Sequence, residues 1–255
     1  MIWNGFPILA AAHFTISAGA VGLAATRWRK SSAWLLASST VILAVFLAAI
    51  WIDMERPPLR TYGETRLVYA MGAGILSILL WTRIRQTWTL VYGASISALF
   101  VAITWGLPES HTRELLPALR SPWFVPHVTV YLMGYAVCTA TSIAAFLDLK
   151  RRVEGGRNLD ELLAASNVLL TCGLLFGALW AKEAWGSYWT WDPKETWAFL
   201  TWSGYMGVLH WRRLRPSEPL AGTRFLAAWW IVLLLAWFAV GYLPAGAHSV
   251  HTYAN

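Results

Sequence analysis

The sequence predicts an all-α fold, a polytopic membrane helical bundle with about eight transmembrane helices and both termini on the extracytoplasmic side. Of the 255 residues, 57% are hydrophobic and only 13% are charged, whereas soluble domains carry about 25% charged residues. The mean hydropathy is +0.49, and apolar runs long enough to cross a bilayer recur along the chain. This composition excludes a disordered chain, a collagen-like fibre and a disulfide scaffold, and it disfavours an ordinary soluble enzyme.

Eight runs approach the roughly 20 apolar residues that a transmembrane helix requires. In order they are 5–26, 32–52, 65–82, 86–105, 124–147, 161–182, 193–212 and 224–243. The third run is short, so we expect its helix to begin before residue 65. The sixth opens on the polar pair Asp160 and Glu161, which places its first turn at the membrane surface. The longest connection, 106–123, is too short for a separate domain, so residues 1–255 are expected to form a single membrane domain.

The basic residues predict the orientation of these helices. Thirteen of the 20 Lys and Arg residues fall on one side of the predicted bundle and seven on the other. By the positive-inside rule, the richer side is cytoplasmic. The outer face therefore carries 53–64, 106–123, 183–192 and 244–255. This topology accounts for the net charge of +7, so we expect a lipid bilayer as a partner and no nucleic acid.

Other local features carry less information. Cys138 and Cys172 lie in apolar runs and form no CxxC motif, so we expect them to be small packing residues. The first residues have no basic cluster ahead of the apolar run, and we therefore expect no cleaved signal peptide.

Tryptophan concentrates at the predicted outer end of the sixth and seventh runs. Seven of the 18 Trp lie between Trp180 and Trp211. An aromatic belt at the membrane interface is one explanation. The alternative is a rigid aromatic shelf for a planar apolar ligand. The density of the cluster favours the shelf, which would consist of Trp185, Trp189, Trp191 and Trp197.

Asp192 and Glu195 in the same stretch have two compatible interpretations. Asp192, Pro193 and Glu195 fit the N-cap, N1 and N3 positions of a capping box, which would begin the seventh helix. A capped helix start would also fix the neighbouring Trp side chains, so the capping role does not exclude a binding site.

Two histidines are expected at the outer face beside the Trp cluster. His127 opens the fifth run, and His248 follows the eighth. Two neutral imidazoles at one membrane level could ligate a haem iron from opposite sides. His251 could replace His248, and His111 is a weaker candidate because we expect it in a mobile loop.

The remaining two histidines lie within membrane runs. His210 falls in the last turn of the seventh run, where an imidazole can simply interact with the helix dipole. His13 lies inside the first run, where a polar side chain is costly and usually functional. Their expected depths differ, so the sequence does not pair them.

The motif WGSYWTWDPKETW at 185–197 resembles the WWD signature of the haem-handling family that assembles cytochromes c. Its DPKE ending is similar to the CcsA (ResC) branch, which belongs to the system II synthase. Segments that also resemble this branch are 56–64, 121–127, 201–210 and 246–249. The likeness covers most of the chain, and the WWD stretch is its most specific part.

The resemblance implies a function. Haem b would bind under the WWD segment, including Asp192, with His127 and His248 as axial ligands, and His210 would hold haem in transit across the membrane. Apocytochrome c, through its CxxCH thiols, would then receive the haem by thioether formation. The protein would thus be an inner-membrane component of a holocytochrome c synthase, active on the extracytoplasmic face.

The resemblance also implies a partner. The second membrane histidine of the family belongs to a CcsB/ResB-like membrane protein, and no motif shows that His13 replaces it. Candidates to hold the haem propionates are the outer cations Arg56, Arg60, Arg66, Lys182 and Lys194. Two alternatives stay open: haem presentation to a chaperone, as CcmC-type proteins do, and a membrane b-type electron-transfer cytochrome.

Overall fold

The computed structural model describes residues 2–111, 121–151 and 157–236, and every regular element among them is helical. Contacts between Cα atoms divide the chain into two compact units, unit 1 (residues 1–115) and unit 2 (residues 116–255). The all-α prediction is confirmed, and the prediction of a single domain over 1–255 stays a prediction.

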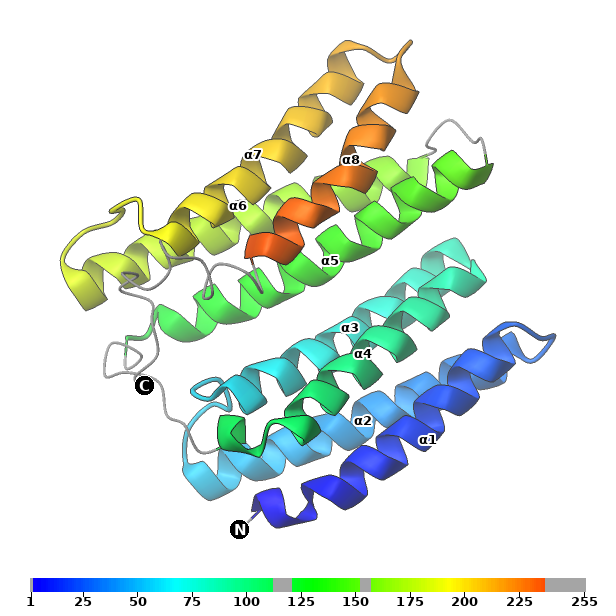
Figure 1. The fold of residues 1–255 in the computed structure, drawn as a ribbon, viewed down its shortest axis with the longest axis vertical. Coiled ribbons are helices and arrows are strands. Elements are labelled where there is room, and N and C mark those ends of the chain that lie inside the picture. Colours follow the sequence, from blue (N-terminus) through cyan, green and yellow to red (C-terminus); the bar gives the residue numbers. More distant parts are fainter. Residues whose placement is uncertain (1, 112–120, 152–156, 237–255) are drawn as a thin grey trace. The chain divides into compact units, whose positions relative to one another are not determined.

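Unit 1 is a four-helix bundle. Its helices are α1 (Phe6–Ala24), α2 (Arg29–Met54), α3 (Tyr62–Ile84) and α4 (Thr87–Gly106), flanked by the 3-10 turns η1 (Ile2–Gly5) and η2 (Pro108–His111). Each helix packs on the next, and α4 packs on α1 to close the ring, as Figure 1 shows. Short connections make neighbouring helices antiparallel.

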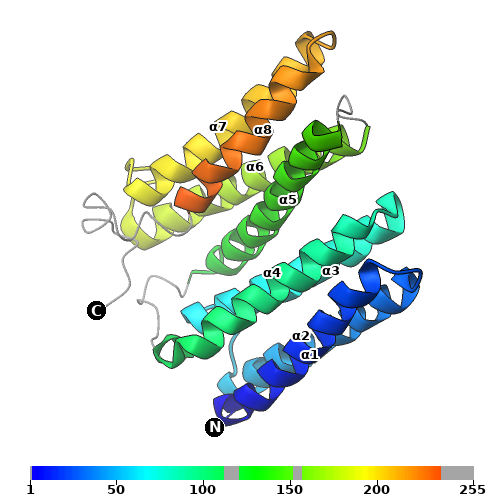
Figure 2. The ribbon, with the colours of Figure 1, turned by 45° about the vertical axis from the view of Figure 1, so that its right-hand side comes forward.

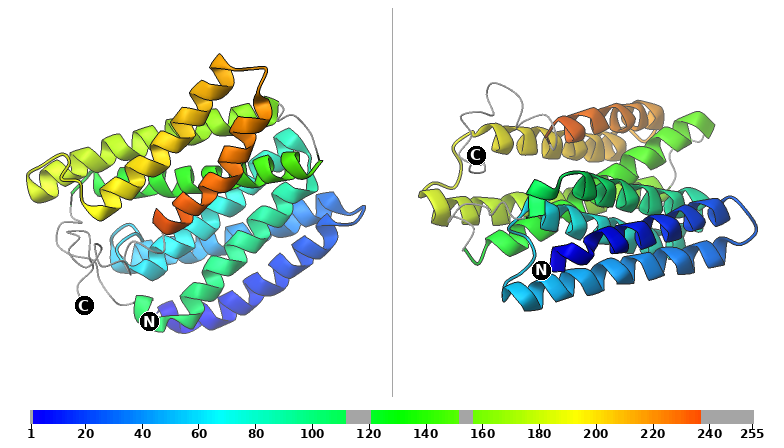
Figure 3. Two further views of the ribbon diagram at one scale, coloured as in Figure 1. Left: turned by 45° about the horizontal axis from the view of Figure 1, so that its top comes forward. Right: turned by 60° about the horizontal axis from the view of Figure 1, so that its bottom comes forward.

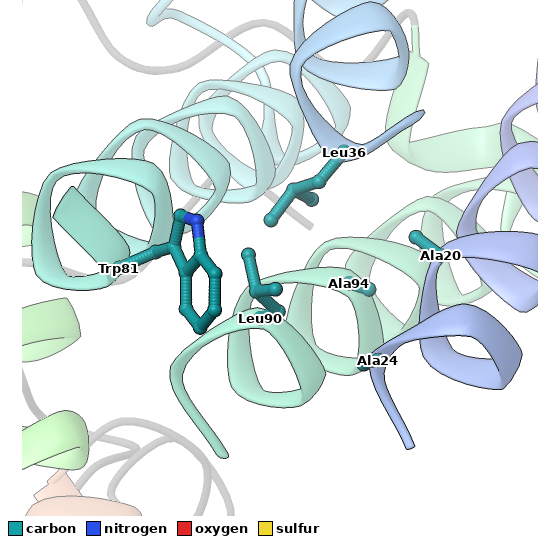
Figure 4. Packing of buried hydrophobic residues seen from close by; sticks show 6 residues of the cluster. All are labelled: Ala20, Ala24, Leu36, Trp81, Leu90 and Ala94. Atoms are coloured by element: carbon teal, nitrogen blue, oxygen red, sulfur yellow. The ribbon is translucent and has the colours of Figure 1, made fainter. Parts of the chain in front are cut away.

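The core of unit 1 combines apolar side chains with close backbone approaches. Ala20, Leu36, Trp81 and Leu90 are among the buried residues of one cluster drawn from all four helices, and Figure 4 shows this packing. Elsewhere, a Cβ added at Gly74 would lie 2.3 Å from Oγ1 of Thr40. Such small-residue contacts let membrane helices pack closely.

Unit 2 is also an arrangement of four helices, and its first two, of 28 and 29 residues, are the longest in the described chain. Its helices are α5 (Phe124–Arg151), α6 (Arg157–Trp185), α7 (Pro193–Leu214) and α8 (Pro219–Leu234). Each packs on the next, and α8 packs on α5; Figures 2 and 3 show α7 and α8 lying together. The N-terminal end of α5, the C-terminal end of α6 and the N-terminal end of α7 meet at one end of the bundle, which we call the aromatic end.

Six helices among the described residues are long and apolar enough to cross a membrane: Ile2–Ala24, Arg29–Met54, Tyr62–Ile84, Thr87–Gly106, Phe124–Arg151 and Asn158–Trp185. Many of their large apolar side chains are exposed, such as Trp34 (75%) on α2 and Phe146 (61%) on α5, as expected where lipid surrounds a bundle. The chain is therefore an integral membrane protein.

The predicted spans agree with the helices in number, but α7 does not qualify as a span by composition and α8 does not by its described length. Helix α7 has 22 residues, yet Glu195 and Lys194 begin it and Arg212 and Arg213 end it. Helix α8 is 16 residues long within the described part, and the predicted eighth run, 224–243, continues beyond residue 236. Eight spans and outward-facing termini therefore stay predictions.

The third helix does begin before residue 65, because a capping box starts it at Tyr62. Oγ1 of Thr61 accepts a hydrogen bond from the backbone N–H of Glu64 at 3.1 Å, and the Glu64 carboxylate accepts one from the Thr61 N–H. The fully buried Glu64 carboxylate also accepts hydrogen bonds from Nη1 and Nη2 of Arg56 at 2.9 and 3.1 Å. Arg56 is thus engaged in fixing this connection, which weakens it as a propionate ligand.

Candidate functional site

The start of α5 is fastened to the end of α6. Oγ of Ser121 accepts a hydrogen bond from the backbone N–H of Trp123 at 3.2 Å and donates one to the Glu183 carboxylate at 2.6 Å. The ring of Phe124 lies 5.6 Å from that of Trp180. These contacts set the position of the first turn of α5, which carries His127.

The imidazole of His127 packs against α6. Its Nδ1 lies 2.9 Å from the carbonyl oxygen of Gly173. A carbonyl oxygen can only accept a hydrogen bond, so Nδ1 carries the proton and Nε2 of the neutral ring has the lone pair. The ring stacks on Trp180, with 5.5 Å between centroids and 18° between planes. His127 therefore has a defined orientation and tautomer.

The WWD segment (residues 185–197) leaves α6 next to this ring. Trp185 ends the helix and packs edge-on against Trp180, with 4.6 Å between centroids. Gly186 follows with φ of +82°, a conformation that suits glycine. Nζ of Lys182 donates to the Gly186 carbonyl at 2.9 Å. Trp185 thus belongs to the same aromatic group as His127.

The predicted capping box at the start of α7 is confirmed. Asp192 is the N-cap, and its side chain accepts a hydrogen bond from the backbone N–H of Lys194 at 2.9 Å. The buried Glu195 carboxylate accepts from the backbone N–H groups of Thr190 and Asp192 at 2.8 and 3.1 Å. Two carboxylates therefore hold the turn between the tryptophans and the helix.

A cavity of about 340 Å³ opens at the aromatic end, on the α6–α7 side. Its lining residues are Thr171, Leu174, Leu175, Trp189, Trp191, Phe199 and Trp202. The Thr171 hydroxyl is engaged, because it donates to the Asn167 carbonyl and accepts from Nε1 of Trp202 at 2.9 Å. The cavity is therefore apolar and largely aromatic, a lining typical of small-molecule sites.

The predicted shelf of four tryptophans is divided into two groups. Trp185 joins Trp180 and His127, whereas Trp189 and Trp191 line the cavity and pack edge-on, with 5.7 Å between centroids. Trp197 is half-buried on α7 and is not among the lining residues. At 100° per residue, the α6 residues that meet His127 and those that line the cavity lie on different faces of the helix.

Sequence reasoning missed several members of these groups. Trp180, Phe199 and Trp202 belong to them, and so do the small residues Gly173 and Gly177. The GxxxG spacing of the two glycines was the available signal for a close helix contact.

The other predicted ligands have different surroundings. His248 and His251 lie outside the described residues. His210 is exposed on α7, and its Nδ1 donates to the Met206 carbonyl at 2.9 Å, in agreement with an interaction at the helix C-terminus. His13 is fully buried in unit 1, where Nε2 lies 3.1 Å from Oγ of Ser97.

His111 lies in a 3-10 turn and not in an irregular loop as expected. This residue ends η2, and its Nε2 donates to the Thr104 carbonyl at 2.9 Å. The ring stacks on Trp3 with 4.0 Å between centroids and 9° between planes. Packing against two segments of unit 1, rather than loop character, determines its position.

The described residues contain no group of three or more His, Cys, Asp or Glu side chains that could hold a metal ion. Both cysteines are free, Cys138 being buried and Cys172 partly buried.

The sequence model of the family described as "Cytochrome C assembly protein" matches residues 28–248, which is most of the chain. The chain belongs to this family. The matched range includes His127, the WWD segment, His210 and His248, whereas His13 precedes it. The resemblance inferred from the motifs is thereby confirmed.

Relatives agree with this assignment. The cytochrome c biogenesis protein CcsA of Chlamydomonas reinhardtii is 31% identical over 235 residues, covering 84% of this chain and 67% of its own. A protein with the same name from Prochlorococcus marinus strain SARG is 28% identical, with coverages of 84% and 82%. Another, from strain MIT 9301, is 36% identical over 188 residues, with coverages of 56% and 59%.

Proposed function

We propose that the protein binds haem b at the aromatic end of unit 2 and takes part in its delivery and covalent attachment to apocytochrome c. The membership in the cytochrome c assembly family supports the role in cytochrome c biogenesis. The observation that supports the site is the packing of His127. This histidine, a residue type that ligates iron, lies 58 positions before Trp185, the start of the WWD segment, yet both rings pack against Trp180.

The chemistry of these residues suits haem as the substrate. A haem brings four nitrogen ligands of its own, so the protein needs to supply only axial ligands. The Nδ1–H tautomer of His127 leaves the lone pair on Nε2, the usual iron-binding arrangement. The cavity of about 340 Å³ on the α6–α7 side is within the range of small-molecule sites, and its aromatic lining suits a planar apolar ligand.

The other ligands follow from the family resemblance. His248 is the proposed second axial ligand. Helix α8 begins where Arg212, near the end of α7, contacts the Pro219 carbonyl, so α8 runs toward the end of unit 2 that carries His127. His210 is the proposed transit ligand, about 27 Å from Asp192 by helix rise, too far to bind the same iron.

Attachment requires no protein nucleophile. In the proposed reaction, each cysteine sulfur of the CxxCH sequence bonds to one vinyl carbon and the thiol proton goes to the other, so no electrons are lost. The protein would hold the haem edge within reach of these thiols. It would act at the extracytoplasmic face of the bacterial plasma membrane, as the component of a holocytochrome c synthase that pairs with a CcsB/ResB-like protein.

The test is the haem spectrum of detergent-purified protein. We expect low-spin haem that acid acetone extracts, because the bound haem is not yet covalently attached. His127→Gly should lose most of the low-spin signal, and added imidazole should restore it by occupying the vacated position. Trp34→Ala, at an exposed position of unit 1, serves as a control that should leave the spectrum unchanged.

Two outcomes would contradict the proposal. Purified wild-type protein that neither carries haem nor takes it up would refute haem binding. A wild-type spectrum in His127→Gly would refute the ligand assignment.

A further inference from the structure

The ring of His127 lies against α6 at Gly173 and Gly177, where the absence of side chains leaves a notch. We infer that these two glycines are positioning residues, which set the orientation and the tautomer of the His127 ring for binding iron. The inference rests on the proposed function, since it concerns the residue proposed there as a ligand. It goes further, because it assigns a role to two residues of a helix that contributes no ligand.

Gly177 provides the space for the imidazole. A Cβ built there would lie 2.7 Å from Cε1 and 2.9 Å from Nδ1 of His127, closer than such atoms approach. Helix side chains lean toward the N-terminus, so a side chain at 177 would also cover the carbonyl of residue 173. Glycine at this position therefore leaves that carbonyl open to the imidazole.

Gly173 supplies the carbonyl and the space for the next ring along α5. Its oxygen accepts the Nδ1–H of His127 at 2.9 Å. A Cβ at Gly173 would lie 2.3 Å from Cδ2 of Tyr131, and the Tyr131 ring lies 5.4 Å from that of His127. One glycine thus admits His127, and the other admits the aromatic ring packed beside it.

The arrangement has a defined chemical consequence. The hydrogen bond places the proton on Nδ1, so the neutral ring can ligate iron only through Nε2. A carbonyl acceptor on the other nitrogen also raises the basicity of a ligating histidine, and loss of such partners typically costs about 10- to 100-fold in affinity. The notch therefore acts on the iron through the imidazole, without touching the haem.

The test is Gly177→Ala in the full-length chain. The new methyl group must displace the imidazole, so we expect haem affinity to fall about 10- to 100-fold and low-spin haem to become high-spin. Added imidazole should restore the low-spin spectrum, which a general loss of folding would not allow. The double variant His127→Gly/Gly177→Ala should behave like His127→Gly alone, because removal of the ring removes the conflict.

Two glycines provide matched controls. A Cβ at Gly134 lies 3.3 Å from Cβ of Leu169, so Gly134→Ala perturbs the same α5–α6 contact without meeting the imidazole. A Cβ at Gly207 meets nothing within 4 Å. Both variants should keep the wild-type spectrum.

Each outcome decides the inference. A wild-type spectrum in Gly177→Ala, or the same spectral change in Gly134→Ala, would overturn it. If Gly177→Ala fails to accumulate, recovery of the protein in the double variant supports a conflict with the ring, and failure to recover overturns it. A changed spectrum in His127→Gly beside an unchanged one in Gly177→Ala refutes only the positioning role, whereas an unchanged His127→Gly refutes the ligand itself.

Discussion

Trp191 combines an unusual backbone conformation with an exposed ring. Its φ is +59°, which is uncommon for a bulky residue, and 63% of its surface is exposed although it lines the cavity. A hydrogen bond to the backbone stabilises this turn without involving the indole ring, because Oγ1 of Thr196 donates to the Trp191 carbonyl at 3.2 Å. Folding thus places a large apolar ring where it contributes little to the core.

We therefore expect Trp191→Gly to reduce haem binding rather than folding. Glycine adopts the positive φ without strain, so the variant removes only the ring. Loss of its aromatic contacts should lower haem affinity about 10-fold, corresponding to about 1.4 kcal/mol, while the amount of inserted protein stays unchanged. Protein level and haem per protein should be measured together. Trp34→Ala, an exposed tryptophan of unit 1, is the control, and equal losses of protein and haem in Trp191→Gly would contradict a binding role.

At the scale of single residues, the sequence identified the important residues better than it predicted which of them contact one another. It singled out His127 because the chain has only six histidines, and it singled out the tryptophans because four of them fall within the 13 residues 185–197. It could not assign Trp180 to His127, since they are 53 positions apart and meet only through helix packing. It also gave no sign that one face of α6 meets His127 while another lines the cavity.

Two helices, α3 and α7, begin with a capping box, so the effects of the two boxes can be compared. Thr61 and Glu64 start α3 in unit 1, whereas Asp192 and Glu195 start α7 beside the cavity. In each, the side chains satisfy backbone N–H groups that the first helical turn leaves without partners. The two capping boxes should therefore contribute similarly to the stability of the protein, but only the box of α7 should affect haem binding.

We expect Asp192→Ala and Thr61→Ala each to destabilise the protein by about 0.5–2 kcal/mol, measured by thermal unfolding in detergent. Only Asp192→Ala should also lower haem per protein, because its turn carries Trp189 and Trp191. Haem loss in both variants would show that the effect follows from stability alone.

The helices were predictable because apolar length is a local property. All eight predicted runs overlap observed helices, and the third helix begins at Tyr62, three residues before its predicted run. The seventh run was predicted as a span from its apolar content, its length and its cap; it forms α7, but α7 does not qualify as a span by composition. Charged residues at both ends, Glu195 in its first turn and Arg212 and Arg213 in its last, lower its mean hydropathy.

For the whole molecule, the distribution of basic residues predicts that the chain ends outside the cytoplasm. A phosphatase fused after Asn255 should be active, and a fluorescent protein fused there should be dark, because the positive-inside rule places thirteen basic residues on the opposite side. A matched pair of fusions in the connection near Arg215 should give the reverse result. A bright fluorescent fusion after Asn255 would place the aromatic end on the cytoplasmic side.

The apolar cavity limits what the protein can discriminate. Its lining consists of aromatic and aliphatic side chains, and the Thr171 hydroxyl already has hydrogen-bond partners. The cavity can therefore select a ligand by its shape but not by its charge. Such a lining would contact a metal-free porphyrin as readily as an iron porphyrin. Among the described residues, selectivity for the central metal would then depend on a single atom, Nε2 of His127.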